Sequence, residues 1–235
     1  MPQTGLVSES ILSDRETTPR TIAFNKPYGE LPCFTDSDGR QILGHYIDLP
    51  VVCAAGRRAM ILTSDGRVAH YITDPQHKMP KMYVAQVERI PNEEALDQLR
   101  RGVVLNGKKT RPAEACLLPG DPQLPDRPVP IRFRKNVPTA WLEIMLREGL
   151  NRQVRRMTAA VEHPTLRLIR IAVGPISLGD LKPGEWRVLS GDEIEQIYRS
   201  VEYTAVRDPS ESSSLSASFL RRIQGGTLSG VARMG

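Results

Sequence analysis

The chain has 235 residues, of which 40% are hydrophobic and 25% charged, so it has enough material for one large domain or two subdomains. Lys and Arg number 32 against 27 Asp and Glu, a formal net charge of +5 that fits an anionic partner. No apolar run is long enough to span a membrane, and the N-terminus lacks the apolar core of a signal peptide. These observations exclude a membrane protein and favour a cytoplasmic one.

Cysteine and histidine are few and scattered. The cysteines form no C-x-x-C pair, and each has apolar neighbours, so we expect reduced core residues at Cys33, Cys53 and Cys116. No zinc site is expected, because the four histidines show no ligand-like cluster: His45, His70, His77 and His163.

The N-terminal half alternates short apolar segments with turns. Residues 1–19 are polar and are predicted to be a disordered tail. We expect strands at 21–24, 51–55, 60–63 and 83–87, an amphipathic segment at 41–47, and helices at 68–73 and 93–101. The dipeptides Asp65-Gly66 and Asn106-Gly107 predict hairpin-type turns.

The C-terminal half continues the same pattern. We expect strands at 103–105, 110–118, 131–135, 139–147 and 165–171, a Pro-rich loop at 119–130, and a closing helix at 192–200. Residues 201–235 are rich in Ser and Gly and are predicted to be disordered. Short strands in hairpins with few helices predict an α+β domain over residues 20–200, built on a mixed, mostly antiparallel sheet.

A basic helix is predicted within residues 148–161, with Asn151 as its N-cap. At helical spacing Arg152, Arg155 and Arg156 share one face, and apolar side chains occupy the other. Residues 131–170 hold nine Lys and Arg against three Glu, so this segment carries the whole excess of positive charge. The pattern favours nucleic acid as the partner, with an ordinary solvated charged face as the alternative.

Six motifs occur in a fixed order: Phe24-Asn-Lys-Pro-Tyr-Gly29, Ala55-Gly-Arg57, Leu62-Thr-Ser-Asp-Gly66, Lys81-Met-Tyr83, Glu148-Gly-Leu-Asn-Arg-Gln-Val-Arg-Arg-Met157 and Leu181-Lys-Pro-Gly-Glu-Trp-Arg187. Over about residues 20–190 they resemble two types of bacterial rRNA pseudouridine synthase: type A, for the small ribosomal subunit, and type E, for the large one. Type E is the nearer, because the chain has no room for the N-terminal S4 module of most relatives.

The resemblance implies a pseudouridine-synthase-like fold, with two subdomains and flanking helices around a central basic cleft. It implies that a uridine in large-subunit rRNA is isomerised: the glycosidic bond breaks, the base turns, and it is rejoined through carbon. The uridine must first be extruded from its helix into a pocket. RNA is therefore the implied partner of a monomeric protein that needs no cofactor or metal.

The family's pocket uses an aspartate nucleophile, a tyrosine that stacks on the base, and an arginine that pairs with the aspartate. Motif matching assigns the stacking role to Tyr83 and the pairing role to Arg155; their alternative roles are an ordinary strand aromatic and a phosphate contact. Lys26 and Arg57 are expected to line the pocket or to contact RNA. Phosphate contacts are expected from four further residues: Arg134, Lys135, Arg152 and Arg156.

The nucleophile is missing from its expected place. The family motif Gly-Arg-Leu-Asp is followed by a polar stretch and a Leu-rich strand, whereas this chain reads Gly56-Arg-Arg-Ala-Met-Ile-Leu-Thr63. Both flanks match, but the middle is several residues shorter, and the aspartate falls in the gap. Asp65 lies on the order of 25 Å beyond Arg57 along a strand, and Asp48 precedes the strand, so neither is expected to replace it. We also expect a shorter, straighter connection here and a pocket open on that side.

The sequence therefore predicts an rRNA pseudouridine synthase by family that is inactive as written, because a covalent step needs its nucleophile placed to within about an ångström. One alternative retains activity through another acid. Another is a non-catalytic rRNA-binding or ribosome-assembly protein derived from a synthase. In a third, the fold is a relic and the basic patch is merely solvated.

Overall fold

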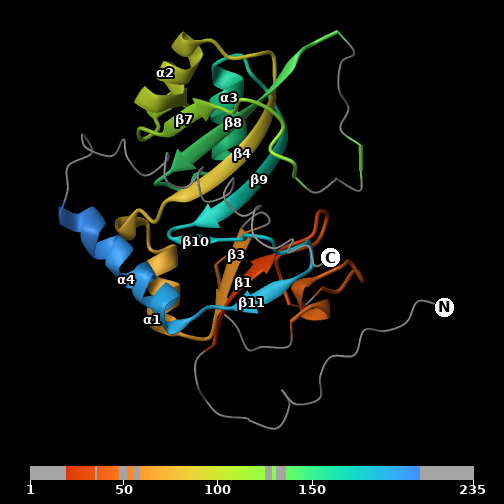
Figure 1. Cartoon of the computed structure of the whole chain (residues 1–235), viewed down its shortest axis with the longest axis vertical. Helices are drawn as coiled ribbons and strands as arrows, with labels where there is room; N and C mark the ends of the chain where they lie inside the picture. Colours follow the sequence, from red (N-terminus) through yellow and green to blue (C-terminus); the bar gives the residue numbers. More distant parts are fainter. Residues whose placement is uncertain are drawn as a thin grey trace, which may run out of the picture.

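The computed structural model describes residues 20–34, 36–47, 52–54, 59–124, 129–130 and 136–206. They form an α+β fold in which a five-stranded sheet and a four-stranded sheet follow one another along the long axis (Figure 1). Nearly all strand pairs are antiparallel, as the sequence predicts. Three expected segments lie outside the described residues: the tail at 1–19, residues 207–235 of the tail expected at 201–235, and the strand at 131–135.

The four-stranded sheet has the order β11-β1-β3-β2. Its strands are β1 (Thr21–Asn25), β2 (Val52–Ala54), β3 (Ala59–Thr63) and β11 (Trp186–Val188). Every side chain of β1 and β3 is buried. Because successive side chains of a strand point to opposite faces, both faces of this sheet are covered.

Each face of the four-stranded sheet has its own apolar cluster. Phe24 and Leu62 pack with Leu43 of the 3-10 helix η2 (Leu43–His45). On the other face Ile61 packs with Ile72 of α1 (Gly66–Thr73) and Ile197 of α4 (Gly191–Val206). α1 and α4 lie side by side (Figure 1). The rings of Tyr71 and Tyr198 meet edge to face between them, with centroids 4.9 Å apart. α4 extends to Val206, so the predicted helix end at residue 200 and the disorder predicted for residues 201–206 are wrong.

Two local predictions are corrected in this sheet. β2 pairs antiparallel with β3, with Val52 opposite Thr63 and Ala54 opposite Ile61, so the chain reverses direction between them. The expected straighter connection is therefore wrong, since backbone pairing of two consecutive antiparallel strands requires a reversal. Asp65 does not form a hairpin turn either: its carboxylate accepts the N–H groups of Arg67 and Val68 and caps α1.

The five-stranded sheet has the order β10-β9-β4-β8-β7. Its strands are β4 (Lys81–Glu88), β7 (Glu114–Leu117), β8 (Thr139–Leu146), β9 (Thr165–Val173) and β10 (Ile176–Ser177). One face packs against α2 (Glu93–Arg101) and α3 (Gln153–Ala160), which place Leu99 and Met157 against Leu142 in the largest core cluster. The predicted helix 93–101 is confirmed with the same bounds.

A small hairpin follows α2. It joins β5 (Val104–Leu105) to β6 (Lys108–Lys109) through Asn106 and Gly107, both at positive φ (52° and 76°). The predicted turn is confirmed, but the partner strand is shorter and earlier than the expected 110–118. No helix in the described part of the chain is both long and apolar enough to cross a membrane.

Candidate RNA-binding cleft

A cleft of about 1450 Å³ lies between the two sheets. Its walls come from the turn after β1, the end of α1 with η3 (Pro75–His77), the start of β4, the β5–β6 hairpin, the segment that leads into α3, and β9. Eleven Lys and Arg residues line it against three acids. Pockets for small molecules usually measure about 300–1,000 Å³, so a space of this size and charge suits an anionic polymer better than a metabolite.

The structure brings together four of the residues that the sequence singled out. Lys26, Tyr83, Arg152 and Arg155 all line this cleft, although up to 129 positions separate them along the chain. Arg156 is not among the lining residues. The remaining three lie outside the described residues: Arg57, Arg134 and Lys135.

The turn after β1 is held by its own lysine. Lys26 is only 7% exposed, and its ammonium donates to the carbonyls of Pro27 (2.7 Å) and Glu30 (2.8 Å). The preceding Asn25 donates through Nδ2 to the Leu181 carbonyl (2.6 Å), which ties the first sequence motif to the last. The motif residues therefore fix one rim of the cleft as well as lining it.

Tyr83 lies on β4 opposite Arg170 of β9 and Ile144 of β8. Tyr83 is half-buried: it packs against the largest core cluster and also lines the cleft. Lys81, two positions earlier and so on the same face, donates to the Met79 carbonyl (2.9 Å). Burial lowers the pKa of Lys81, and the positive charge of Arg170 lowers it further.

The segment that leads into α3 is closed by Gln153. Its amide nitrogen donates to the Glu148 carboxylate and its amide oxygen accepts the Leu150 N–H (3.1 Å). Glu148 also accepts the Arg111 N–H (2.9 Å), which joins this turn to the chain beyond the β5–β6 hairpin. Gln153 is only 4% exposed. The sequence patterns do not predict that Gln153 closes this turn. The only signal for it in the sequence is that Gln153 follows Glu148 by five positions.

The predicted N-cap of α3 is wrong. Arg152, not Asn151, occupies the cap position, in the left-handed region (φ 51°), and no side chain caps the helix. The hydrogen bonds of Gln153 close the turn in place of an Asn cap. Arg152 is consequently displayed at the very start of the helix, where it lines the cleft.

Arg155 lies one turn further along α3. Its Nη1 donates to the Thr165 carbonyl (2.7 Å) at the start of β9. The hydroxyls of Thr158 and Thr165 also share a hydrogen bond (2.6 Å). The first contact holds the Arg155 guanidinium against β9, and the second joins α3 to the same residue of β9. Arg155 also lines the cleft.

Comparison with known proteins identifies this architecture. No family model matches the chain. A Vibrio parahaemolyticus protein named ribosomal large subunit pseudouridine synthase E is 48% identical over 174 residues, covering 72% of this chain and 73% of the relative. A Xanthomonas campestris protein of the same name is 49% identical over 175 residues, covering 71% of this chain and 94% of the relative. The chain belongs to the ribosomal pseudouridine synthase family.

A solved pseudouridylate synthase shares the fold of this family member. The two superimpose with a TM-score of 0.61 at 24% identity, covering 77% of this chain and 74% of the other. The family and the α+β fold that the six motifs indicate are thus confirmed.

One cluster of potential metal ligands lies at the edge of the same cleft. Ligand atoms of His70, Asp74 and His77 are all within 4.8 Å of one another. The expectation that the histidines form no ligand-like cluster is therefore wrong. It fails because the contact depends on a helix followed at once by a 3-10 turn, which the sequence pattern does not reveal.

Proposed function

We propose that this chain binds large-subunit rRNA in its basic cleft and, as written, does not isomerise the uridine that it binds. The observation that carries the proposal is a synthase-family cleft, lined by eleven basic residues, whose nucleophile segment contains no acid. Residues 20–200 form the RNA-binding domain, as two subdomains around the cleft, in a cytoplasmic monomer.

The binding half of the proposal rests on the walls of the cleft. Basic residues on both sides of a groove neutralise phosphates and position an RNA without reading its sequence. Arg152 contributes from α3, and Lys108 and Lys109 contribute from the β5–β6 hairpin. Tyr83 supplies a stacking surface for a uracil turned out of its helix.

The non-catalytic half rests on the carboxylates. From Val51 to Ser64 the chain has no Asp or Glu, so neither β2 nor β3 nor their connection offers a nucleophile. Asp65 caps α1. Of the acids that line the cleft in the described residues, Asp74 caps η3 and Glu148 accepts from Arg111 and Gln153.

The third cleft acid, Glu30, supports a second candidate function, which is retained isomerase activity through a substitute carboxylate. Its Oε1 accepts from the Tyr46 hydroxyl (2.8 Å), whereas its Oε2 is buried and has no hydrogen-bond partner among the described residues. Burial raises the pKa of Tyr46, and the hydrogen bond to Glu30 raises it further. Among the described residues, Glu30 is thus a cleft acid with a buried second oxygen that no hydrogen bond occupies.

RNA binding is tested by two arginines of the same segment. Arg152→Ala removes a cleft-lining charge and should weaken binding of a large-subunit rRNA fragment, lowering the slope of log K against log salt by about 1. Arg156→Ala removes the same charge outside the cleft and should have a smaller effect. Equal losses in the two variants, or no rRNA binding at low salt, would refute the assignment of the cleft.

The two functions are separated by turnover. The chain as written should form no pseudouridine in labelled rRNA. If pseudouridine appears and Glu30→Gln abolishes it, the second candidate replaces the first. If it appears and survives Glu30→Gln, both accounts of the site are wrong.

A further inference from the structure

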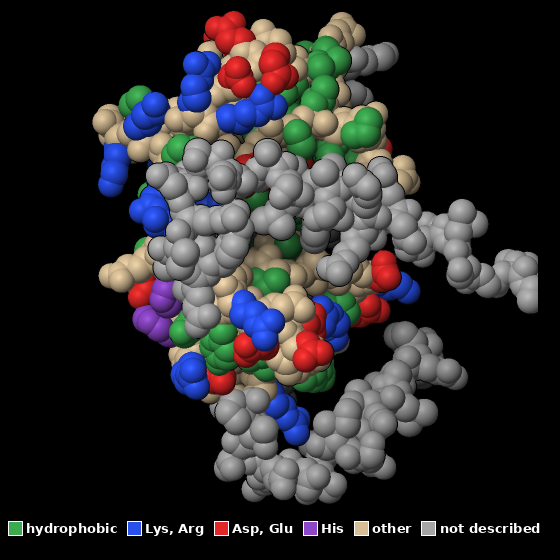
Figure 2. All heavy atoms as spheres, turned by 60° about the vertical axis from the view of Figure 1, so that its left-hand side comes forward, with side chains coloured by type: hydrophobic (Ala, Val, Ile, Leu, Met, Phe, Trp, Pro, Cys, Tyr) green, Lys and Arg blue, Asp and Glu red, His purple; other side chains and the backbone are tan. Residues whose placement is uncertain are grey.

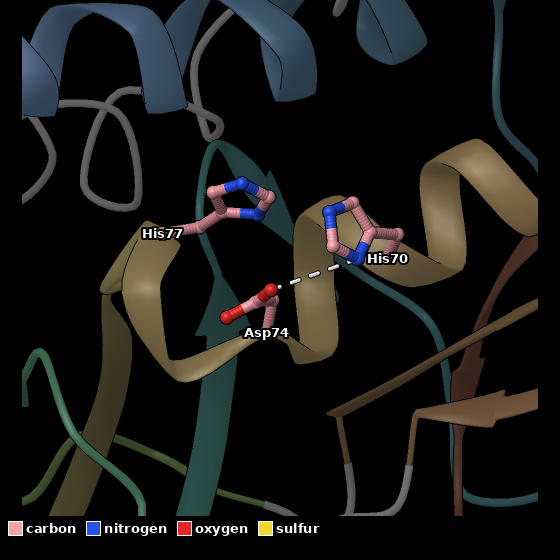
Figure 3. Close-up of side chains that lie close together, drawn as sticks. All are labelled: His70, Asp74 and His77. Atoms are coloured by element: carbon pink, nitrogen blue, oxygen red, sulfur yellow. Dashed lines mark ion pairs between the residues drawn. The ribbon is translucent and has the colours of Figure 1, made fainter.

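Three side chains converge where α1 passes into η3. His70 comes from the last turn of α1, Asp74 from the junction, and His77 from the end of η3 (Figure 3). His70 Nδ1 lies 3.7 Å from Asp74 Oδ2, and the two imidazole rings have centroids 4.9 Å apart. Histidine side chains reach the surface on the face shown in Figure 2.

The backbone holds this arrangement by two consecutive turns. The Asp74 N–H donates to the His70 carbonyl (3.0 Å) and closes α1, while the His77 N–H donates to the Asp74 carbonyl (3.1 Å) and closes η3. Asp74 Oδ1 accepts the Gln76 N–H (2.7 Å), which fixes the carboxylate and leaves Oδ2 facing His70. With Pro75 as the first residue of η3, the direction of the chain between the two turns is restricted.

His77 is held in place by Tyr71. Its Nδ1 lies 3.3 Å from the Tyr71 carbonyl. Its ring is also held by that of Tyr71, at a centroid distance of 4.9 Å. These two contacts hold the His77 ring beside His70 and Asp74.

We propose that His70, Asp74 and His77 form a zinc site, with water completing the coordination. Zinc takes imidazole nitrogen and carboxylate oxygen at about 2.0–2.2 Å in tetrahedral geometry, which places neighbouring ligand atoms roughly 3.4 Å apart. The 3.7 Å between His70 and Asp74 is close to that separation. The remaining ligand atoms lie within 4.8 Å of one another, and rotation of the exposed His70 side chain shortens its distances to the other two.

The site lies at the rim of the cleft, because Asp74 is among its lining residues. Bound zinc would join α1 to η3 and stiffen this wall, whether or not the cleft binds RNA. The proposal is therefore independent of the proposed function. An ordinary surface pair between His70 and Asp74 is the competing account, and it predicts no metal binding.

Zinc titration of the full chain, with its cysteines alkylated, tests the site. We expect one zinc per chain with micromolar affinity, and a rise in the melting temperature on saturation. His70→Ala and His77→Ala should each weaken binding by at least about tenfold. His163→Ala is the matched control, since His163 lies outside the cluster and its variant should bind zinc as the parent does.

A loss of zinc affinity in His70→Ala can be distinguished from a loss of folding. His70 has a side chain that is 60% exposed, so its replacement leaves the packing intact, and the melting temperature without zinc reports this directly. No zinc binding by the parent chain would overturn the proposal. So would unchanged affinity in a folded His70→Ala variant, or equal losses in His70→Ala and His163→Ala.

Discussion

Lys26 is a motif residue that stabilises the turn at one rim of the cleft. A lysine after an apolar strand suggests an RNA contact, yet its ammonium turns inward to two carbonyls of the following turn. Charge-assisted hydrogen bonds at a nearly buried position contribute more to stability than an exposed cation does. The position also explains why Asn25 and Lys26 occur together, since one fixes the strand end and the other the turn.

Lys26→Met should lower the free energy of unfolding by about 1.5–3 kcal/mol, because two carbonyls lose a charged donor. Urea unfolding measures this loss. Lys78→Met is the control: Lys78 also lines the cleft but is exposed, so its replacement should leave stability nearly unchanged. A Lys26 variant as stable as the Lys78 variant would show that the ammonium does not hold the turn.

The N-terminus of α4 is held by a pair of capping hydrogen bonds. Ser190 and Glu193 cap α4 reciprocally, since each side chain accepts the backbone N–H of the other. Arg187 of β11 adds two hydrogen bonds to the same carboxylate, both 2.7 Å. The hydrogen bond from Arg187 is the largest cause of the lowered pKa of Glu193. One carboxylate thereby joins a helix start to an edge strand.

Glu193→Gln should destabilise the fold by about 1 kcal/mol at neutral pH, the usual value of a helix cap. The folded pKa of Glu193 is depressed, so its stabilising effect is present above the unfolded pKa and is lost as pH falls through the folded value. The stability gap between parent and variant should therefore shrink in acid, as thermal unfolding at neutral and acidic pH would show. Asp192→Asn, at the neighbouring position, should show a smaller gap at neutral pH. A gap that is unchanged in acid would contradict this account.

The sequence predicts most of these elements because local signals agree with the fold. Asn92 followed by acids and then by Gly102 marks α2 completely, and Asn106-Gly107 marks its hairpin. Prediction fails where one signal has two meanings. The Asp-Gly pair at Asp65 suits a hairpin turn and a helix cap equally, and only the helix that follows decides between them.

The site is predicted less fully than the fold, for a different reason. Motifs identify Tyr83 and Arg155 as cleft residues, but they do not reveal that Arg152 occupies the N-cap position of α3 while Gln153 closes the turn. The cluster of His70, Asp74 and His77 depends on two turns in succession, which no single periodicity signals. The sequence pattern of a single helix or strand does not reveal contacts that several elements form together.

At the scale of the whole molecule, Arg170 joins the two sheets. It lies on β9, is only 5% exposed, and donates to the Ala59 carbonyl at the start of β3 with both Nε (2.8 Å) and Nη2. β3 begins at Ala59, so the same contact fixes the first residue of that strand. The cleft between the sheets keeps its shape through such links.

Arg170→Leu should lower the free energy of unfolding by about 1–3 kcal/mol, because the Ala59 carbonyl loses its donors at a buried position. Chemical denaturation measures the change. Arg199→Leu on α4 is the control, since Arg199 is exposed and pairs within its own helix, with Glu195. Unchanged stability of the Arg170 variant would mean that the two sheets are held together by other contacts.

The most direct measurement is pseudouridine formation in large-subunit rRNA by two proteins assayed side by side. One is the chain as written; the other carries Leu-Asp and a polar loop ending in Gly, inserted after Arg57. We predict that both bind the rRNA and that only the rebuilt protein forms pseudouridine, because the proposed function holds that the nucleophile is the one missing part. Turnover by the chain as written, at a rate like that of the rebuilt protein, would contradict this account.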